Sequence, residues 1–230
     1  MNDPIVSASD PILLAGGGEF RHADLIVART WASRAVAADG GAEVLLRHGV
    51  TPEAVIGDFD SLPDAVRAAL PAGALHHIAE QDSTDFDKCL RHIAAPLILG
   101  LGFLGARVDH QLSVFNRLVA RPDVRCILIG RDDVVFHCPR EITLTLAPRM
   151  RVSLFPMRPV TGRSAGLRWP IDGLDFAPGG RVGTSNEATG AEVRLEMDGP
   201  GMLVILPRAA LDPAVRAVLS VACAPWSAHG

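Results

Sequence analysis

The chain has 230 residues, of which 48% are hydrophobic, so it can bury a substantial core in one large domain or two smaller ones. Its formal net charge is −4, and only 5% of its residues are aromatic, with no tyrosine. This composition lacks the basic surface and the stacking side chains that nucleic-acid binding needs, so we expect no nucleic-acid partner.

The cysteines and the hydropathy pattern predict a soluble, cytoplasmic protein. The four cysteines are far apart and form no CxxC pair, which favours reduced, mostly buried thiols over disulfides or a zinc site. They are Cys89, Cys126, Cys138 and Cys223. The first residues are polar and acidic, unlike a signal peptide, and no apolar run approaches the roughly 18 residues of a membrane helix, so we expect no membrane partner.

The first half of the chain alternates strand-like and helix-like segments. In chain order they predict a strand at 11–18, a helix or a helix and a strand at 21–41, a helix at 42–52, a strand at 54–57, helices at 64–73 and 84–94, a strand at 96–105, a helix at 110–120 and a strand at 124–130. Apolar strands separated by helices indicate a mostly parallel sheet in an α/β domain.

The second half has a different pattern, with two-residue alternation or short apolar runs divided by proline and glycine. The segments are 141–148, 150–156, 166–171, 191–197 and 201–207. This pattern predicts an all-β sandwich or barrel. We expect an N-terminal domain over 1–137, a second domain over 138–208, and a tail over 209–230 with a short helix after Pro213.

The unusual polar residues of the first half follow the predicted strands. Asp58 and Asp60 come after the strand at 54–57, and on a continued strand they would share one face, with Phe59 on the other. Two carboxylates so close repel each other unless a positive charge lies between them. Ligands of open α/β sheets bind at the carboxyl ends of the strands, so we expect one cluster there. Its other members are Asp39, Gly40, Gly41, Asp82, Thr84, Asp85, Arg107 and Asp109.

Such a cluster suits metal-assisted chemistry on a polyphosphate. Several aspartates without a His-Cys set favour Mg²⁺ over Zn²⁺. Glycine-rich turns leave backbone N–H groups free to approach phosphate, and Lys88 and Arg107 supply positive charge to its oxygens. The sequence has neither the GxxxxGK[ST] motif of P-loop enzymes nor the GxGxxG motif of dinucleotide-binding proteins.

Each of these features also has an ordinary structural interpretation. Thr84 and Asp85 can simply cap a helix, Lys88 can be a solvated helix charge, and Trp169 can belong to the core. Arg107 with Asp109 can be a surface ion pair. The pair Asp58 and Asp60 is harder to dismiss, because no lysine or arginine stands near it in the sequence.

Six motifs, taken together, resemble the thiamine pyrophosphokinase family. They are ADGGAEVLL at 38–46, PEAVIGDFDSL at 52–62, QDSTDFDKCL at 81–90, GFLGARVDH at 102–110, GLRWPI at 166–171 and GTSNEATGAEVRLE at 183–196. The similarity runs from about residue 13 to residue 206. It implies transfer of a pyrophosphoryl group from ATP to thiamine with Mg²⁺, giving thiamine diphosphate and AMP. It also implies an α/β domain followed by a β-sandwich, in a homodimer that holds thiamine between one subunit's first domain and the other's second.

The resemblance assigns roles to residues that match the family's motifs. The metal ligands would be Asp58, Asp60 and Asp85. The residues near the nucleotide and its phosphates would be Asp39, Gln81, Lys88, Arg107 and Asp109, and Gly40, Gly41, Asp82 and Thr84 join them from the strand-end argument. Thiamine would be bound by Trp169, Ser185 and Asn186. Two alternatives stay open: another Mg²⁺-dependent phosphotransferase or phosphohydrolase, and a thiamine- or nucleotide-binding protein without turnover.

Overall fold

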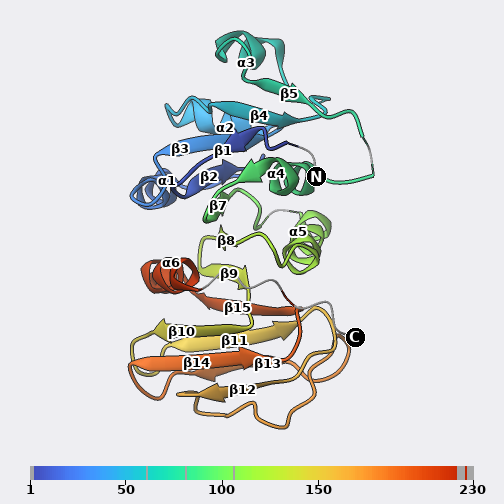
Figure 1. Cartoon of the computed structure of the whole chain (residues 1–230). Coiled ribbons are helices and arrows are strands. Elements are labelled where there is room, and N and C mark those ends of the chain that lie inside the picture. Colours follow the sequence, from blue (N-terminus) through green and yellow to red (C-terminus); the bar gives the residue numbers. More distant parts are fainter. Residues whose placement is uncertain (1–2, 61, 81, 106, 222–225, 227–230) are drawn as a thin grey trace. The chain divides into compact units, whose positions relative to one another are not determined.

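The computed structural model describes residues 3–60, 62–80, 82–105, 107–221 and 226 (Figure 1). The chain divides into two compact units, and each is described by itself. The first comprises Met1–Arg117 and Leu128–Arg131, and the second comprises Leu118–Ile127 and Asp132–Gly230. Strand β8 (Cys126–Ile129) lies where the chain passes between them.

The first unit is built on a parallel sheet with the strand order β7-β2-β3-β4-β5. The strands are β2 (Ile12–Ala15), β3 (Arg34–Ala38), β4 (Ala54–Gly57), β5 (Leu75–His77) and β7 (Ile98–Leu101). A short parallel pair joins β1 (Val6–Ser7) to β6 (Ile93–Ala94). Strands β2, β4 and β7 are buried along their whole length, which explains why they appear in the sequence as continuous apolar runs.

The helices of this unit are α1 (His22–Arg29), α2 (Gly41–Arg47), α3 (Asp64–Ala69) and α4 (Asp85–His92), followed by α5 (Val108–Ala120), which continues into the second unit. Helix α2 packs on β2 and β3, and α4 packs on β3 and β4. Helix α4 buries Phe86, Cys89 and Leu90, whose helical spacing places them on one apolar stripe. It also buries Lys88, so the interpretation of Lys88 as a solvated helix charge is wrong.

Most predicted elements of the first half are present. Segment 21–41 holds a helix and a strand, the second of the two predicted alternatives. Helix α2 ends at Arg47, before the end of the predicted segment 42–52, and is followed by Gly49 at a φ of 76°, a conformation typical of the residue after a helix. Strand β5 was not predicted, because two of its three residues are exposed and it has no apolar run.

The second unit contains two antiparallel sheets, so the predicted fold class is confirmed (Figure 1). One has the order β13-β11-β15-β9 and the other β10-β14-β12. Their strands are β9 (Asp133–His137), β10 (Glu141–Thr145), β11 (Arg151–Pro156), β12 (Gly162–Ala165), β13 (Gly183–Glu187), β14 (Glu192–Met197) and β15 (Met202–Pro207). Alternate residues of β10 and β14 are buried, the pattern of strands with one face on a core.

The structure corrects two predicted elements of this half. Segment 166–171 is a loop, joined to the rest by an isolated bridge at Leu167, and the neighbouring strand is β12 at Gly162–Ala165. After a 3-10 turn (η1, Arg208–Ala210), helix α6 (Leu211–Ser220) begins before Pro213 and not after it. Pro213 lies in the first turn, where its missing N–H has no intrahelical partner to lose.

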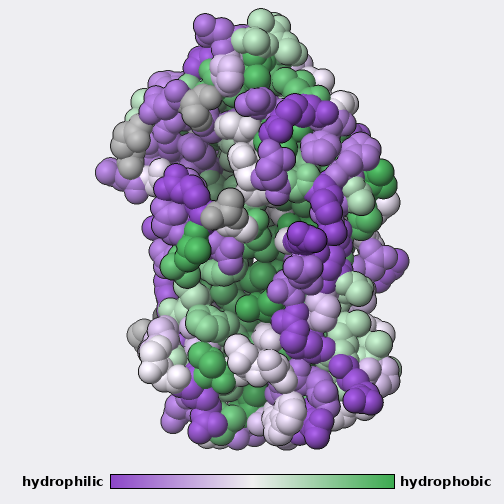
Figure 2. Space-filling view, turned by 180° about the vertical axis from the view of Figure 1, so that it is seen from behind, coloured by the Kyte–Doolittle hydropathy of each residue, from purple (hydrophilic) through white to green (hydrophobic). Residues whose placement is uncertain are grey.

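The described cysteines agree with the sequence-based expectation. Cys89, Cys126 and Cys138 are free and buried, and Cys223 lies outside the described residues. No helix among the described residues is both long enough and apolar enough to span a bilayer. The face seen in Figure 2 mixes hydrophobic and hydrophilic side chains, and the exposed large hydrophobic residues of the second unit are Phe155, Trp169 and Val182.

His137, on β9, is a partly buried histidine in the second unit. Its Nε2 accepts a hydrogen bond from the backbone N–H of Gly201 at 3.1 Å. Burial, assisted by the positive charge of Arg158, lowers the pKa of His137 from 6.5 to about 4. The folded protein therefore holds this imidazole neutral.

We predict that the stability of the protein falls as the pH drops from about 6.5 to about 4, because the unfolded chain protonates His137 in this range and the folded chain does not. The loss from this group is up to about 3 kcal/mol. His137→Gln, which keeps an acceptor but does not titrate, should flatten the curve in urea titrations. The exposed His110→Gln is the control and should leave the curve unchanged.

Candidate active site

Asp39 follows β3 directly and is held in a tight turn. Its φ is 40°, and its backbone N–H donates to the carbonyl of Ile56 on the neighbouring strand at 3.0 Å. Helix α2 begins two residues later at Gly41, where a Cβ would lie 2.1 Å from the carbonyl oxygen of Ala15. The glycine therefore allows α2 to start against the end of β2, and the buried Asp39 stays at the carboxyl edge of the sheet.

The stretch after β4 leaves the strand at Gly57, so the two aspartates do not follow strict alternation. Phe59 has a φ of 64° and is buried, a strained conformation for an aromatic residue. Arg67 on α3 donates to the carbonyls of Phe59 at 2.7 Å and Leu62 at 3.1 Å, and its guanidinium lies 5.6 Å from the Phe59 ring centroid. These contacts hold the turn that carries Asp58.

Asp85 is the first residue of α4, which Thr84 caps. The Thr84 hydroxyl accepts a hydrogen bond from the backbone N–H of Asp87 at 3.3 Å. A carboxylate in the first turn also interacts favourably with the helix dipole. The cap interpretation of Thr84 is therefore confirmed, and the cap fixes where Asp85 enters the site.

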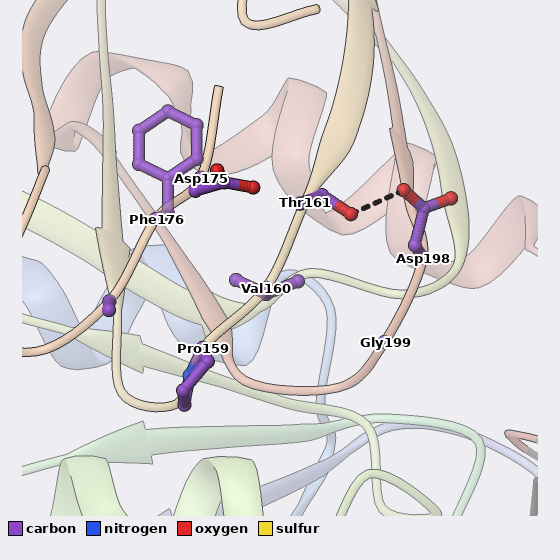
Figure 3. Close-up of a pocket in the computed structure, with 8 residues that line it drawn as sticks. Pro159, Val160, Thr161, Asp175, Phe176, Asp198 and Gly199 are labelled. Atoms are coloured by element: carbon purple, nitrogen blue, oxygen red, sulfur yellow. Dashed lines mark hydrogen bonds between the residues drawn. The ribbon is translucent and has the colours of Figure 1, made fainter. Parts of the chain in front are cut away.

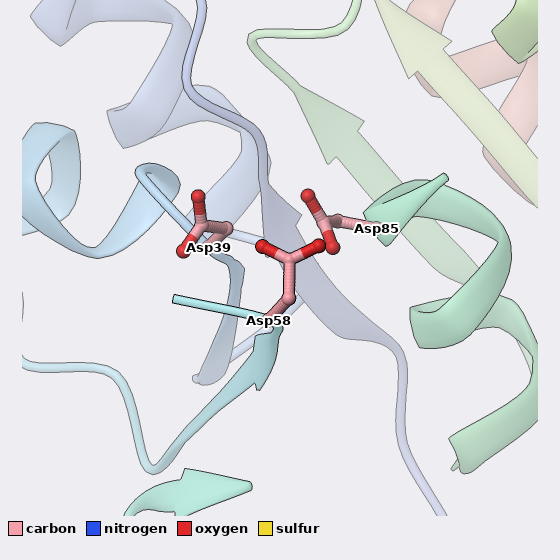
Figure 4. Close-up of side chains that lie close together, drawn as sticks. All are labelled: Asp39, Asp58 and Asp85. Atoms are coloured by element: carbon pink, nitrogen blue, oxygen red, sulfur yellow. The ribbon is translucent and has the colours of Figure 1, made fainter. Parts of the chain in front are cut away.

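The structure brings Asp39, Asp58 and Asp85 together in a carboxylate cluster. One carboxylate oxygen from each lies within 4.8 Å of the others. Figure 4 shows the three side chains converging from the end of β3, the turn after β4 and the start of α4. Among the described residues, exposed Asp60 is not part of this set, and its backbone N–H donates to Asp58 Oδ1 at 3.4 Å. The assignment of Asp60 as a metal ligand stays a prediction.

The ammonium of Lys88 lies inside the cluster and offsets part of the repulsion between its carboxylates. Its Nζ is 3.0 Å from Asp58 Oδ2 and 3.0 Å from Asp85 Oδ1, and its side chain is 1% exposed. Burial alone would lower the pKa of Lys88, but the hydrogen bonds that its ammonium donates to Asp58 and Asp85 outweigh it and leave that pKa raised. Burial also raises the pKa of Asp85, against the opposing effect of Lys88.

The segment before α4 is tied to the last turn of that helix by an ion-pair network. Arg91 pairs with Glu80 and donates to Ser83 Oγ at 2.7 Å, and its Nε is 3.4 Å from Asp87. Arg117 lies 3.8 Å from the same buried Asp87. None of the predicted site residues belongs to this ion-pair network, although the spacing of Asp87 and Arg91 is that of a helical ion pair. Asp82 of this segment is exposed, and Gln81 lies outside the described residues.

Arg107 and Asp109 form an exposed ion pair at 2.7 Å, as the ordinary interpretation predicts. The hydrogen bond from Arg107 lowers the pKa of Asp109 to about 2. The guanidinium fork of Arg107 thus engages a carboxylate two residues away, through Nε and Nη2. Its predicted contact with phosphate is not tested by this arrangement.

The residues predicted to bind thiamine lie together in the second unit. The Asn186 carboxamide accepts from the backbone N–H of Trp169 at 3.1 Å and donates to the Trp169 carbonyl at 2.6 Å. Neighbouring Ser185 has a φ of 61°, and its backbone N–H donates to Ser153 Oγ at 3.1 Å. Buried Asn186 therefore fixes the backbone of Trp169, a contact that no sequence pattern indicated.

Trp169 itself is 52% exposed, so its interpretation as a core residue is wrong. The Arg168 guanidinium carbon lies 4.7 Å from its ring centroid, and Arg168 also pairs with Glu187 at 2.7 Å. One face of the indole therefore already interacts with a cation, and the geometry shows that this ring can accept one.

The second unit also contains a pocket of about 450 Å³, beside the bridge between Val160 and Phe176 (Figure 3). Asp175 and Asp198 contribute carboxylates to it, and the Thr161 hydroxyl donates to Asp198 at 2.6 Å. The described residues that line it include none of the three predicted thiamine-binding residues.

The carboxylate cluster fits a hard divalent cation. Its potential ligands are all carboxylate oxygens, which Mg²⁺ prefers, and neither histidine nor cysteine belongs to the set found among the described residues. Asp58 and Asp85 are only partly buried, so a cation and a phosphate can reach them from solvent.

Two family models match the chain. Residues 27–128 match the one described as thiamin pyrophosphokinase, catalytic domain, and residues 136–201 match the one described as thiamin pyrophosphokinase, vitamin B1 binding domain. The carboxylate cluster and Lys88 lie within the first match, and Trp169, Ser185 and Asn186 lie within the second.

Individual proteins agree with these matches. The chain is 28% identical over 172 residues to thiamine pyrophosphokinase 1 of Oryza sativa subsp. japonica, an alignment that covers 66% of this chain and 65% of the rice protein. The chain thus spans slightly less than two thirds of the length of that relative. The solved thiamin pyrophosphokinase of Geobacillus thermodenitrificans is 25% identical, with a TM-score of 0.69 over 86% of this chain and 96% of that one. The Candida albicans structure shares the fold, with a TM-score of 0.74, 17% identity and coverage of 89% and 92%.

Gly57 permits the close approach of the acids, so a substitution at Gly57 tests how much this close approach matters. A Cβ there would lie 2.9 Å from the Asp39 Cβ and 3.3 Å from Asp85 Oδ1. Gly57→Ala should therefore displace both carboxylates, destabilise the protein by about 1–3 kcal/mol, and reduce any rise in Tm that is measured on adding Mg²⁺. Thermal melts with and without Mg²⁺ measure both effects.

The control for this variant is Gly190→Ala, since a Cβ at Gly190 meets nothing within 4 Å. It should match the unmodified protein in both melts. An unchanged Mg²⁺ response in Gly57→Ala would contradict the importance of this close approach.

Proposed function

Because the chain belongs to the thiamin pyrophosphokinase family, we propose that it transfers the terminal pyrophosphoryl group of ATP to the hydroxyl of thiamine, releasing AMP and thiamine diphosphate. The observation that carries the proposal is the carboxylate cluster at the ends of β3 and β4, which lies in the segment that matches the catalytic-domain model. A β-rich unit that matches the vitamin B1 binding model adds independent support.

The acids of the cluster have a defined part in this reaction. We propose that Asp39, Asp58 and Asp85, with Asp60 nearby, hold Mg²⁺ together with oxygens of ATP. When bound, Mg²⁺ neutralises charge on the transferred group and aligns it with the attacking hydroxyl. The hydroxyl oxygen attacks the β-phosphorus, and the bond from that phosphorus to the oxygen shared with the α-phosphate breaks. A loose transition state needs little base help, so the hydroxyl proton leaves late, to a carboxylate of the cluster.

We assign the nucleotide and its phosphates to the residues around this edge of the sheet. Arg107 exchanges its contact with Asp109 for phosphate oxygens, where a bidentate fork is most effective. The other proposed nucleotide-binding residues are Gly40, Gly41, Gln81, Asp82, Thr84 and Asp109. Helix α2 starts at Gly41 beside this edge of the sheet, and the positive end of a helix dipole favours an anion.

We assign thiamine to Trp169, Ser185 and Asn186, because the exposed indole suits a cationic aromatic ring. The proposed domains are 1–137 for ATP and Mg²⁺, 138–208 for thiamine, and 209–230 as a tail. We further propose a homodimer in which one subunit's first domain and the other's second share thiamine. The free, buried cysteines support a cytoplasmic location for the reaction.

The direct test is to incubate the protein with Mg²⁺ and ATP, with and without thiamine, and to measure the products by mass spectrometry. We expect thiamine diphosphate and AMP in equal amounts, and only when thiamine is present. ATP loss without thiamine would identify a phosphohydrolase, and ligand-induced stabilisation without product would identify a binding protein.

Substitutions of the individual acids should differ in their effects on turnover and on the melting temperature. Asp39→Asn and Asp60→Asn should each lower kcat about a hundredfold or more, because both remove negative charge beside the metal site. Asp39 is 8% exposed, so its variant should also change the metal-free melting temperature, whereas the exposed Asp60 should not. Asp64→Asn, an exposed acid at the start of α3, is the control. Normal turnover in Asp60→Asn would remove that residue from the metal site.

Trp169 provides a separate test of the second unit. Trp169→Ala should raise KM for thiamine about tenfold and leave KM for ATP unchanged, because the lost stacking and cation–π contact are worth about 1 kcal/mol or more. Trp169→Phe keeps an aromatic face and should recover most of the affinity. Equal effects on both substrates would place Trp169 outside the thiamine site.

A further inference from the structure

Lys88 is the single lysine of the sequence, which uses arginine for its other 21 formal positive charges. The difference is physical, because a lysine ammonium is compact and has three donors around one atom, whereas a guanidinium is a planar fork. Here one nitrogen lies 3.0 Å from two carboxylates that come from different elements. The position therefore suits an ammonium, in a chain that otherwise uses arginine.

We infer that Lys88 is a positioning residue, the internal counter-cation of the carboxylate cluster, and that with Lys88 in place the cluster takes one divalent cation when no nucleotide is bound. The inference deepens the proposed function, since it rests on the same metal site. It changes the role expected of Lys88 from a phosphate contact to a group that acts through the metal ligands.

Burial separates Lys88 from the substrate. Its side chain is 1% exposed, and its Nζ is engaged by Asp58 Oδ2 and Asp85 Oδ1. To reach a phosphate it would have to leave both partners, and a buried charge without partners is very unfavourable. Lys88 therefore stays with the carboxylates.

The contacts of Lys88 also orient these carboxylates. A carboxylate has two oxygens and about four acceptor positions. Lys88 donates to Asp58 Oδ2 and to Asp85 Oδ1, and the backbone N–H of Asp60 donates to Asp58 Oδ1, so these contacts set the orientation of both carboxylates beside Asp39. The ligands are thus arranged before the metal arrives.

The charges set the number of ions. Within the cluster, which does not include the exposed Asp60, the formal charges of the three carboxylates and the one ammonium sum to −2, which one divalent cation balances. A second cation would need further anionic ligands, and among the reactants the phosphates of ATP carry them. Without nucleotide the cluster should therefore bind a single ion.

The test measures binding of Mn²⁺, a spectroscopic probe for Mg²⁺, by electron paramagnetic resonance in the absence of ATP and thiamine. The unmodified protein should bind one Mn²⁺ per chain. Lys88→Met removes the charge and keeps the length of the side chain. It should bind Mn²⁺ at least tenfold more tightly, because the cluster loses its internal cation, and it should melt at a lower temperature than the unmodified protein without metal.

The matched control is Arg117→Met, which removes a cation near Asp87, an acid outside the cluster. Its Mn²⁺ affinity should equal that of the unmodified protein. A merely structural Lys88 would lower the melting temperature without tightening Mn²⁺ binding, so equal or weaker affinity in Lys88→Met overturns the inference. Two Mn²⁺ per unmodified chain overturn the single-ion part.

If Lys88→Met does not fold, the unmodified protein still decides the question. With ¹⁵N-lysine labelling, its single lysine gives one side-chain signal in nuclear magnetic resonance spectra. We expect an ammonium signal that exchanges slowly with water, shifts as Mg²⁺ is added, and saturates at one equivalent. A signal that Mg²⁺ does not move overturns the inference. Because neither experiment contains ATP or thiamine, its outcome is independent of whether the protein makes thiamine diphosphate.

Discussion

The main constraint on the first unit is the repulsion between the carboxylates that its topology brings to one edge of the sheet. Asp39, Asp58 and Asp85 come from three separate elements, and their oxygens lie within 4.8 Å. Such a set is unfavourable by itself, and the buried ammonium of Lys88 offsets part of its charge. Removing one partner of a buried ion pair typically costs about 3–5 kcal/mol. The cluster and Lys88 must therefore be understood together.

The surrounding structure serves to hold these groups in place. Thr84 fixes the start of α4, and Lys88 follows Asp85 by three residues, so both face the same side of that helix. Arg67 stabilises the strained turn at Phe59 by binding its carbonyl. Functional sites typically combine backbone strain with like charges, and contacts from the surrounding structure compensate for both. The local interactions of the fold therefore hold the acids in their positions.

Much of this arrangement could be predicted from the sequence, since apolar parallel strands and the acids at their ends are visible as patterns. The sequence did not predict which three acids lie nearest one another. The chain leaves the strand at Gly57, so strand alternation no longer decides where Asp60 lies. The burial of Lys88 was hidden as well, since a charged residue on a helix is normally solvated. The sequence left Trp169 either in the core or in a thiamine site, and it did not indicate that the side chain of Asn186, 17 residues away, holds the backbone of Trp169. Long-range contacts of this kind leave no periodic signal.

Two cations of the first unit, Arg107 and Lys88, differ in how readily they can change partners. Arg107 is exposed and paired with Asp109, and an exposed ion pair of this kind contributes little to stability because water screens it. Its guanidinium can move to a phosphate at small cost, and the proposed function needs such a move. Lys88 is buried between two carboxylates and cannot exchange them without leaving charges unpaired in the interior. Burial thus distinguishes Arg107, which can change partners, from Lys88, which belongs to the architecture of the site.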